Sequence, residues 1–346
     1  MSKKYFFITA LFLLLVIAGC NRPGPLEIYR GTSGVEISFM DSAPQRDLYE
    51  RNEVLITVEA WNKGAYSLVS QEEHAIIGLS YDPLYFRDVT PDRTTGYAQI
   101  STFLQGKSIG WPTGERTLAN IAVLEVRDVP GTRETPITNI KANVCYPYRT
   151  FLTETVCMDA DIYNIAHRPV CRNQPRHSYS SQGAPVVIER LDSEMLPAGT
   201  VTQSEIAGRP IADPDGWLTG IGREQQDTSL MAVQPSFTIH LRNAGRGIVL
   251  TRKEDQPVNS VCGAGSDALT MGDINGLNVN AWLGNIKLTC QPETVSMIGG
   301  RGQARCFVPR NESIVVVSNY IDTLSVEVDY FYREEISKEV RINRII

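Results

Sequence analysis

Histidine, tryptophan and positive charge are all scarce in this chain. Of its 346 residues, four are His and four are Trp, and the 33 Lys and Arg are outnumbered by 39 Asp and Glu, for a formal net charge of -6. An acidic chain is poorly suited to the phosphate backbone of a nucleic acid, so we expect no nucleic-acid partner. With so few histidines, little side-chain chemistry is available for acid–base work near neutral pH.

Sequence signatures of common catalytic folds are absent as well. The chain has no Gly-x-Ser-x-Gly, no P-loop and no His-Glu-x-x-His. The glycine clusters at 263–265 and 299–302 do not follow a strand into a helix, and we interpret them as hairpin turns. The histidines are scattered along the chain, at His74, His167, His177 and His240. We therefore predict a non-enzyme without a cofactor.

The chain also lacks long hydrophobic runs, apart from one at its start. Lys3 and Lys4 precede an uncharged, mostly apolar run over 5–19. That run is shorter than the roughly 20 residues that cross a bilayer, and it is typical of a secretory signal peptide. It closes with Ile17-Ala18-Gly19-Cys20, which resembles the lipobox of prokaryotic lipoproteins.

The lipobox resemblance implies cleavage before Cys20 and a diacylglyceryl group on its thiol. We therefore expect a signal peptide at 1–19, a lipidated tether at 20–25, and a lipid-anchored protein on the extracytoplasmic face of the cell membrane. Two or three acyl chains would hold the protein stably on a bilayer without a membrane-spanning segment. An uncleaved helical anchor, or an ordinary signal peptide with an accidental cysteine, is the alternative.

What the sequence does contain is an internal repeat. Residues 54–64 and 237–245 both read as a strand with alternating apolar residues that ends in Asn-x-Gly, at Asn62 and Asn243. Further on, Ile140–Arg149 parallels Leu324–Arg333 at an offset of 184, and both segments contain Tyr-x-Tyr. Two matches in the same order along the chain indicate two copies of one unit.

Short β-rich runs separated by Gly, Pro and Asn predict an all-β fold, and we find no long helical pattern. Each copy is expected to end with the Tyr-x-Tyr strand, a short turn and a final strand. We predict two tandem immunoglobulin-like β-sandwich domains after the signal peptide, at 26–161 and 183–346, with a linker at 162–182. The period-two spacing of Tyr146, Tyr148, Tyr330 and Tyr332 places these side chains in the core.

A family resemblance follows from these motifs. The Asn-x-Gly strand ends at 61–65 and 242–247 resemble those of immunoglobulin-like and CARDB-like β-sandwich modules of prokaryotic surface proteins. Together with the lipobox, the segments at 145–150, 155–159 and 181–186 are similar to archaeal-type surface lipoproteins. The resemblance implies a binding or structural role and identifies no catalytic residue.

Six cysteines remain when Cys20 is reserved for lipid, and an exported chain would form three disulfides from them. Cys145 and Cys157 align with Asp329 and Arg341 in the second copy, and we expect them on two facing strands, which favours a Cys145–Cys157 bond over Cys157–Cys171. Cys290 and Cys306 flank a glycine-rich hairpin, so we expect them to pair, which leaves Cys171 with Cys262. A zinc site from Cys157, His167, Cys171 and His177 is the rival, but its spacing matches no CxxC-type pattern.

Candidate binding residues are few. Asp273, Asn275 and Asn278 are the best calcium ligands, although they complete no EF-hand loop and Asx-Gly turns arise for conformational reasons alone. Trp111 and Trp217 lie in predicted loops, where binding residues concentrate. Asn311 begins a glycosylation sequon.

The leading hypothesis is a membrane-anchored surface lipoprotein with a structural or adhesive role and a protein partner. The alternative is a lipoprotein that recognises a sugar, a peptide or an envelope polymer through its loop aromatics.

Overall fold

The computed structural model describes residues 28–89, 96–131, 135–159, 170–201, 230–253, 256–263, 270–309 and 319–345. As expected, the described chain is almost entirely β; besides helical Ile28 at its start, the exceptions are the short helix α4 (Val258–Cys262) and the 3-10 turn η2 (Met271–Asp273). No helix among these residues is long and apolar enough to cross a bilayer.

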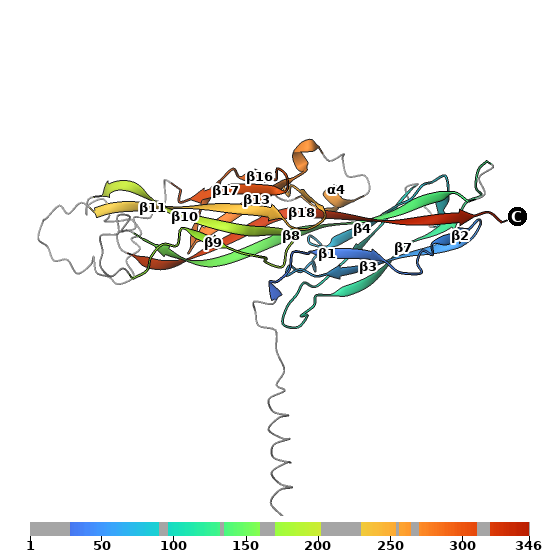
Figure 1. Ribbon diagram of the computed structural model, residues 1–346, viewed down its shortest axis with the longest axis horizontal. Helices are drawn as coiled ribbons and strands as arrows, with labels where there is room; N and C mark the ends of the chain where they lie inside the picture. The colour runs from blue at the N-terminus through green and yellow to red at the C-terminus, as the bar shows by residue number, and fades with distance from the viewer. Residues whose placement is uncertain are drawn as a thin grey trace, which may run out of the picture.

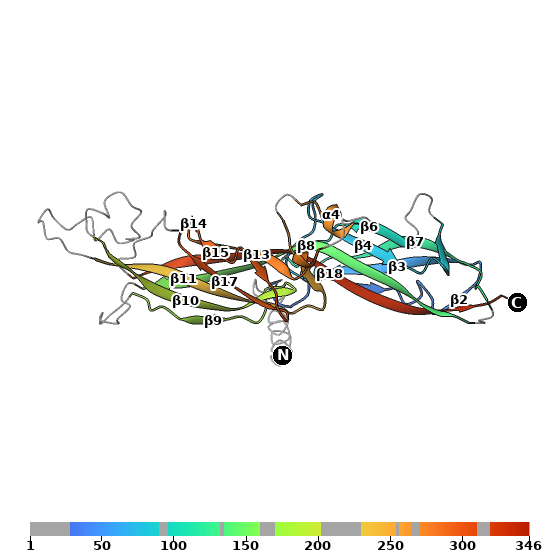
Figure 2. The same ribbon diagram turned by 90° about the horizontal axis from the view of Figure 1, so that it is seen from above.

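Two very long strands form the spine of the molecule. β8 (Ile137–Met158) has 22 residues and β18 (Tyr320–Asn343) has 24. They pair antiparallel from Tyr320 opposite Met158 to Arg341 opposite Ile137. At about 3.3 Å per residue such a strand spans roughly 70 Å, which gives the molecule its elongated shape with one lobe at each end (Figures 1 and 2).

β8 and β18 are the centre of a nine-stranded sheet that runs through both lobes. Its strand order is β14-β13-β18-β8-β4-β6, and β2, β12 and β16 add to it at the side. The flanking strands are β2 (Asp47–Tyr49), β4 (Ala75–Ser80), β6 (Tyr97–Thr102), β12 (Ile248–Leu250), β13 (Gly276–Leu283), β14 (Ile286–Lys287) and β16 (Thr294–Ser296).

Each lobe has a second sheet that packs on one half of the central sheet. In the first lobe the order is β1-β3-β7-β5 and in the second it is β15-β17-β11-β10-β9. These strands are β1 (Val35–Phe39), β3 (Glu53–Asn62), β5 (Phe86–Asp88), β7 (Arg116–Val126), β9 (Arg176–Ser178), β10 (Val186–Val201), β11 (Leu230–Asn243), β15 (Thr289–Gln291) and β17 (Arg301–Phe307). Both lobes are therefore sandwich-like, and side chains from all three sheets form one core.

The alternation that predicted the first strand of each repeat holds in the structure. Ile56, Val58 and Ala60 of β3 are fully buried. Phe237, Ile239 and Leu241 of β11 are fully buried as well. β3 lies between β1 and β7, and β11 lies between β10 and β17, so the two repeats build equivalent sheets.

The repeats meet at the tyrosines. Tyr148 lies opposite Tyr330, and Tyr146 lies opposite Tyr332, with Pro147 facing Phe331 between them. Because Tyr146 and Tyr330 occupy the same place in the two copies, an approximate two-fold axis passes through the Pro147–Phe331 pair. We call the region around this pair the waist.

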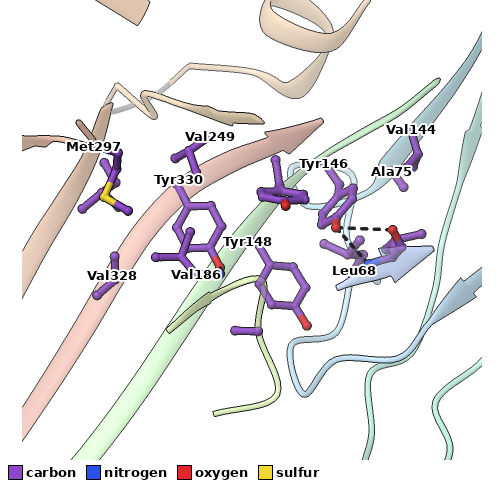
Figure 3. Close-up of a cluster of buried hydrophobic side chains, with 14 of the residues drawn as sticks. Leu68, Ala75, Val144, Tyr146, Tyr148, Val186, Val249, Met297, Val328 and Tyr330 are labelled. Atoms are coloured by element: carbon purple, nitrogen blue, oxygen red, sulfur yellow. Dashed lines mark hydrogen bonds between the residues drawn. The ribbon is translucent and has the colours of Figure 1, made fainter. Parts of the chain in front are cut away.

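The four tyrosine rings pack together at the waist and are buried, as the core prediction required. Figure 3 shows Tyr146, Tyr148 and Tyr330 of this group. Ring centroids are 5.6 Å apart for Tyr146 and Tyr148, and 6.4 Å apart for Tyr330 and Tyr332, in edge-to-face contact. A buried hydroxyl needs a partner. Two of the hydroxyls find theirs in the covering sheets. The Tyr146 hydroxyl accepts from the Val35 backbone N–H at 2.9 Å, and the Tyr330 hydroxyl accepts from the Val186 backbone N–H at 3.3 Å.

The Asn-x-Gly motif serves the other two tyrosines. The Tyr332 hydroxyl donates to the Asn243 side chain at 3.2 Å and accepts from the Gly247 N–H at 2.7 Å. A Cβ on Gly245 would lie only 2.2 Å from that oxygen. In the first lobe Gly64 leaves room for the Tyr148 hydroxyl in the same way. The motif is thus a socket for a tyrosine as well as a turn.

Two expectations about the chain's organisation were wrong. There is no turn after Tyr-x-Tyr, because the alternation continues and each segment forms one unbroken strand. Consequently 26–161 and 183–346 are not separate domains. β8 begins in the first lobe and ends in the second, while the last residues of β18 pair with β2 and the start of β8 in the first lobe.

The predicted linker is also partly structural. Residues 170–182 belong to the second lobe, where β9 pairs with β10 through Arg176 opposite Asp192. A backbone hydrogen bond from Gly183 to Gly31 then returns this segment to the waist. The polar, proline-containing composition therefore marked an edge strand rather than a spacer.

Candidate functional site

The six cysteines that were predicted to form disulfides all do so, but two of the three favoured pairings were wrong. The bonds are Cys145–Cys262, Cys157–Cys171 and Cys290–Cys306. Cys145 and Cys157 lie on the same strand, 12 residues apart, which corresponds to about 40 Å. A bond between them is therefore impossible, whereas Cys290 faces Cys306 across β15 and β17 as expected.

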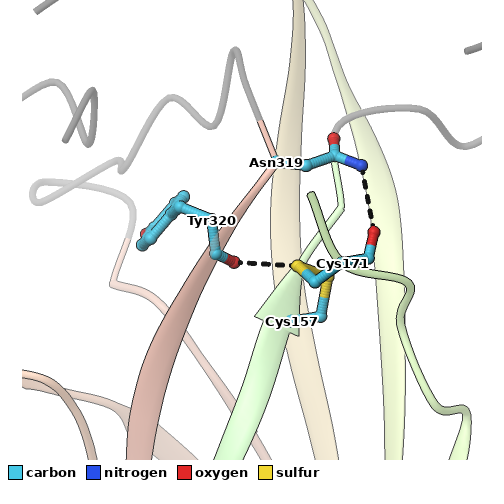
Figure 4. Close-up of a disulfide and its surroundings, with 4 residues drawn as sticks. All are labelled: Cys157, Cys171, Asn319 and Tyr320. Atoms are coloured by element: carbon cyan, nitrogen blue, oxygen red, sulfur yellow. Dashed lines mark hydrogen bonds between the residues drawn. A yellow bond between two sulfur atoms is a disulfide. The ribbon is translucent and has the colours of Figure 1, made fainter. Parts of the chain in front are cut away.

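The Cys157–Cys171 bond fastens the incoming segment of the second lobe to the end of the spine (Figure 4). Asn319 donates to the Cys171 carbonyl at 3.4 Å, and the Cys171 sulfur lies 3.4 Å from the carbonyl oxygen of Tyr320. Because both thiols are in a disulfide, they cannot serve the rival zinc site. His177 instead lies 3.8 Å from Glu154, and His167 lies outside the described residues.

The Cys145–Cys262 bond fixes α4 over the outer face of the waist. Beneath it lies a small second core, separate from the main one. It consists of Ile76, Cys145, Leu250, Val258, Val261, Cys262 and Phe331. Residues from both repeats meet here, so this bond ties one copy to the other.

Beside this small core lies a group of charged side chains that we call the waist cluster: Glu73, Arg149, Arg252, Glu327 and Asp329. The Arg149 guanidinium contacts three carboxylates, with its Nε 2.8 Å from Asp329, and nitrogen–oxygen distances of 3.2 Å to Glu73 and 3.5 Å to Glu327. Arg252 contacts Glu73 at 3.2 Å and Asp329 at 3.7 Å. Arg149 is on β8 and Asp329 is on β18, so the cluster bridges the two repeats.

Direct hydrogen bonds satisfy this cluster only in part. Nε of Arg149 and Oδ1 of Asp329 approach within 2.8 Å but without hydrogen-bond geometry, and Nη1 of Arg252 is buried without a hydrogen bond. We take the short distance as an ionic contact rather than a directed bond. Guanidinium groups with unused donors can bind a carboxylate or a polar ligand oxygen.

The Glu327 carboxyl of the waist cluster has a raised pKa. Burial, together with the adjacent Asp329 carboxyl, raises the pKa of Glu327 to about 7. The Tyr66 hydroxyl donates to Glu73, and burial raises the pKa of that phenol far above its usual range.

An open groove of about 1290 Å³ lies over the waist cluster. Polar side chains line most of it, including Gln71, Arg149, Arg252, Lys253, Asn278 and Asp329. The walls come from both repeats because the spine brings them together here. Such a groove fits a polar, extended ligand better than an apolar one.

A second charged group lies on the outer face of the second lobe. Asp192 on β10 contacts His240 on β11 at 2.8 Å, Arg176 at 3.0 Å and Arg190 at 3.1 Å. Burial alone would raise the pKa of Asp192, but hydrogen bonds from Arg176 and His240 lower it. His240 therefore lies in a polar network rather than facing solvent, and its ring hydrogen-bonds with Arg190 and Asp192.

The calcium candidates do not converge. The Asp273 carboxylate pairs with Lys253 at 2.8 Å and caps η2 through Thr270, and these bonds lower its pKa to about 2. Asn275 takes a positive φ of 60°, which suits an Asx turn. Asn278 donates to the Arg252 carbonyl and accepts from Thr294. In the described chain no three His, Cys, Asp or Glu side chains form a metal-sized group.

The structure describes one of the two tryptophan candidates and not the other. Trp111 is on a loop of the first lobe with 49% of its surface exposed, as expected of a contact residue. Trp217 lies outside the described residues, and so do Asn311 and the whole of 1–27, including Cys20.

Sequence reasoning missed the waist cluster because its members are far apart in the chain. One signal was available: Arg149 and Arg333 both follow Tyr-x-Tyr, and Asp329 replaces Cys145 at the equivalent place. In the structure Asp329 pairs with Arg149, while Arg341 approaches Asp47 at 3.9 Å.

Comparison with known proteins identifies no family for the chain. No family model matches it, and no curated protein matches it. Among solved structures it is similar to the C-terminal domain of the Streptococcus pyogenes antigen I/II-family protein AspA, at 7% identity and a TM-score of 0.18, covering 90% of this chain and 100% of that one. The C-terminal domain of the Streptococcus agalactiae polypeptide BspA follows at 9% identity and a TM-score of 0.16, covering 89% and 99%. TM-scores of this size are below the level at which two chains share a fold.

Proposed function

We propose that this chain is a lipid-anchored surface protein with a structural or adhesive role, and that it acts by non-catalytic contacts. The observation that carries the proposal is the spine. A ladder of 22 facing residue pairs joins the lobes, and three disulfides fasten the surrounding segments to one another. A rigid, extended and cross-linked body suits a protein that bears load or presents a binding site to a partner at a cell surface.

The proposed partner site is the waist groove. It is formed by both repeats, it is wide and open, and its guanidinium and amide groups can bind the carbonyls and carboxylates of another protein. We test this site with a photo-cross-linking amino acid at Asn280 in the groove and, as a control, at exposed Glu53 on β3. On intact cells, the groove probe should capture discrete surface proteins, and Arg252→Ala should weaken that capture. Equal capture by both probes would contradict the site.

The lipid anchor is tested separately. Cys20→Ala should move the protein from the detergent phase to the aqueous phase after Triton X-114 extraction, because a lipoprotein without its acyl chains has no membrane anchor. Partitioning that does not change would exclude lipidation at Cys20.

A second function, capture of a small polar ligand such as a sugar acid, is favoured by one observation. Arg252 keeps a buried nitrogen without a hydrogen bond beside the groove. A ligand of this class should raise the melting temperature in a saturable way, and Arg252→Ala should remove the shift. A protein partner predicts no such shift.

A further inference from the structure

Two apolar side chains project from the loop between β6 and β7. Ile109 is 86% exposed and Trp111 is 49% exposed. The loop is nevertheless well fixed: Ser108 and Trp111 exchange backbone hydrogen bonds of 3.0 and 3.1 Å, and Gly114 donates to Trp111 at 3.0 Å. Two exposed apolar side chains close together on a fixed loop form a candidate contact surface.

The base of this loop is attached to the beginning of the described chain. The Lys107 ammonium donates to the Arg30 carbonyl at 2.9 Å, and its backbone N–H donates to Gly64 at 2.7 Å. Figure 1 shows that the segment before β7 lies on the same side of the waist as the first described residues. The same view places α4 on the opposite side of the molecule.

The sequence limits how far this side can be from a lipid on Cys20. Residues 21–27 separate Cys20 from Ile28. Even fully extended, that stretch spans at most about 30 Å. A lipid on Cys20 would therefore hold the waist, rather than either lobe tip, close to the bilayer.

The surroundings of the loop also suit a membrane surface. Lys107, in the same loop as Trp111, donates its ammonium to the Arg30 carbonyl, and burial together with nearby Lys63 lowers the pKa of this ammonium. Nearby, Lys63 and Arg116 flank the Trp61 ring, 4.2 Å and 4.4 Å from its centroid. Each also forms an ion pair, Lys63 with Glu36 and Arg116 with Glu59. Tryptophan together with Lys or Arg is the combination enriched where proteins meet the headgroup region.

We propose that the loop 107–114 docks on the lipid bilayer, with Ile109 and Trp111 entering the boundary between headgroups and acyl chains. This inference rests on the lipid anchor under Proposed function. Tether and loop together would form two contacts on one side of the waist. The long axis of the molecule would then lie along the membrane, and the outer face under α4 would point away from it.

The test uses the chain from Cys20 onward, coupled through Cys20 to a maleimide lipid in vesicles of phosphatidylcholine and phosphatidylglycerol. The other six cysteines are in disulfides, so coupling is specific. Acyl chains brominated near the headgroup quench tryptophan that enters the bilayer. We expect quenching in the coupled protein, its loss in Trp111→Phe and a marked decrease in Ile109→Ser.

Trp282→Phe is the matched control, because Trp282 is on β13 of the second lobe and should leave the quenching unchanged. Quenching that persists in Trp111→Phe, or that is absent from the coupled wild type, would overturn the docking proposal. Chemical coupling replaces the cell's own lipidation, so this result does not depend on the Cys20→Ala partitioning test. A failed anchor and a failed docking loop are therefore distinguishable.

Discussion

At the scale of single residues, the absence of a side chain at Gly245 is as important as the tyrosine beside it. A Cβ there would lie 2.2 Å from the Tyr332 hydroxyl and 3.0 Å from Pro185. That oxygen is held by bonds to Asn243 and Gly247, so it cannot simply move away.

We predict that Gly245→Ala lowers the free energy of unfolding by about 1–3 kcal/mol, as overpacked cores do. Urea denaturation measures the loss. In a Tyr332→Phe background the alanine should cost clearly less, since the clashing oxygen is gone. Gly110→Ala is the control, because nothing lies within 4 Å of its Cβ position. Costs that simply add in the double variant would contradict the steric explanation.

The raised pKa of Glu327 predicts that the stability of the chain depends on pH. Its pKa rises from 4.5 to about 7 on folding, so the folded chain binds this proton more tightly than the unfolded chain does. The stability that the proton contributes is fully present below pH 4.5 and is lost as pH rises through about 7. Glu327→Gln, which is neutral throughout, should flatten the stability profile in that window.

Urea denaturation at a series of pH values measures this effect. The control is Glu335→Gln, whose side chain is half exposed in an ion pair with Lys141. If the stability of Glu327→Gln changes with pH between 4.5 and 7 in the same way as that of the wild type, the raised pKa of Glu327 is not present in solution.

At the scale of elements, the long central strand β8 contains a proline, Pro147, which most central strands exclude. β4 pairs with β8 only as far as Cys145, so Pro147 lies where one side of β8 has no β4 neighbour. Proline is compatible with a strand at such a position. The gap leaves room above the waist, where α4 and the Cys145–Cys262 bond cover the small second core.

The disulfides should differ in their contribution to stability. Cys145–Cys262 closes a separation of 117 residues, whereas Cys290–Cys306 closes only 16. In the chain-entropy treatment the longer loop contributes about 2 kcal/mol more. Replacing both Cys145 and Cys262 with Ala should therefore lower stability more than replacing Cys290 and Cys306. Equal losses would mean that chain entropy does not dominate here.

At the scale of the whole molecule, exchange of long strands makes the lobes interdependent. The half of β8 in the second lobe needs β18, and the end of β18 is needed beside β2 in the first. Neither repeat encodes a complete sandwich by itself.

We therefore expect the full chain to unfold in one calorimetric transition, with equal calorimetric and van't Hoff enthalpies. The fragment 26–161 should not fold alone, because its final strand would expose an unpaired apolar edge. Two transitions, or a cooperatively folded fragment, would restore the view of independent tandem modules.

The sequence by itself determined the all-β class, the duplication and the buried tyrosines, because alternating polarity and repeated motifs are local properties. It also identified the six cysteines that form disulfides. Of the three pairs, it predicted only Cys290–Cys306 correctly, because these two cysteines flank one hairpin.

The tertiary structure alone decided where each strand ends and which partner it takes. Periodicity in Ile137–Met158 is the same for one long strand as for two short ones, so only pairing with β18 over its whole length decides between them. Cys145 consequently meets Cys262, and Arg149 meets Asp329, across more than a hundred residues of chain. Contacts of this kind depend on the geometry of the shared sheet, which no local pattern encodes.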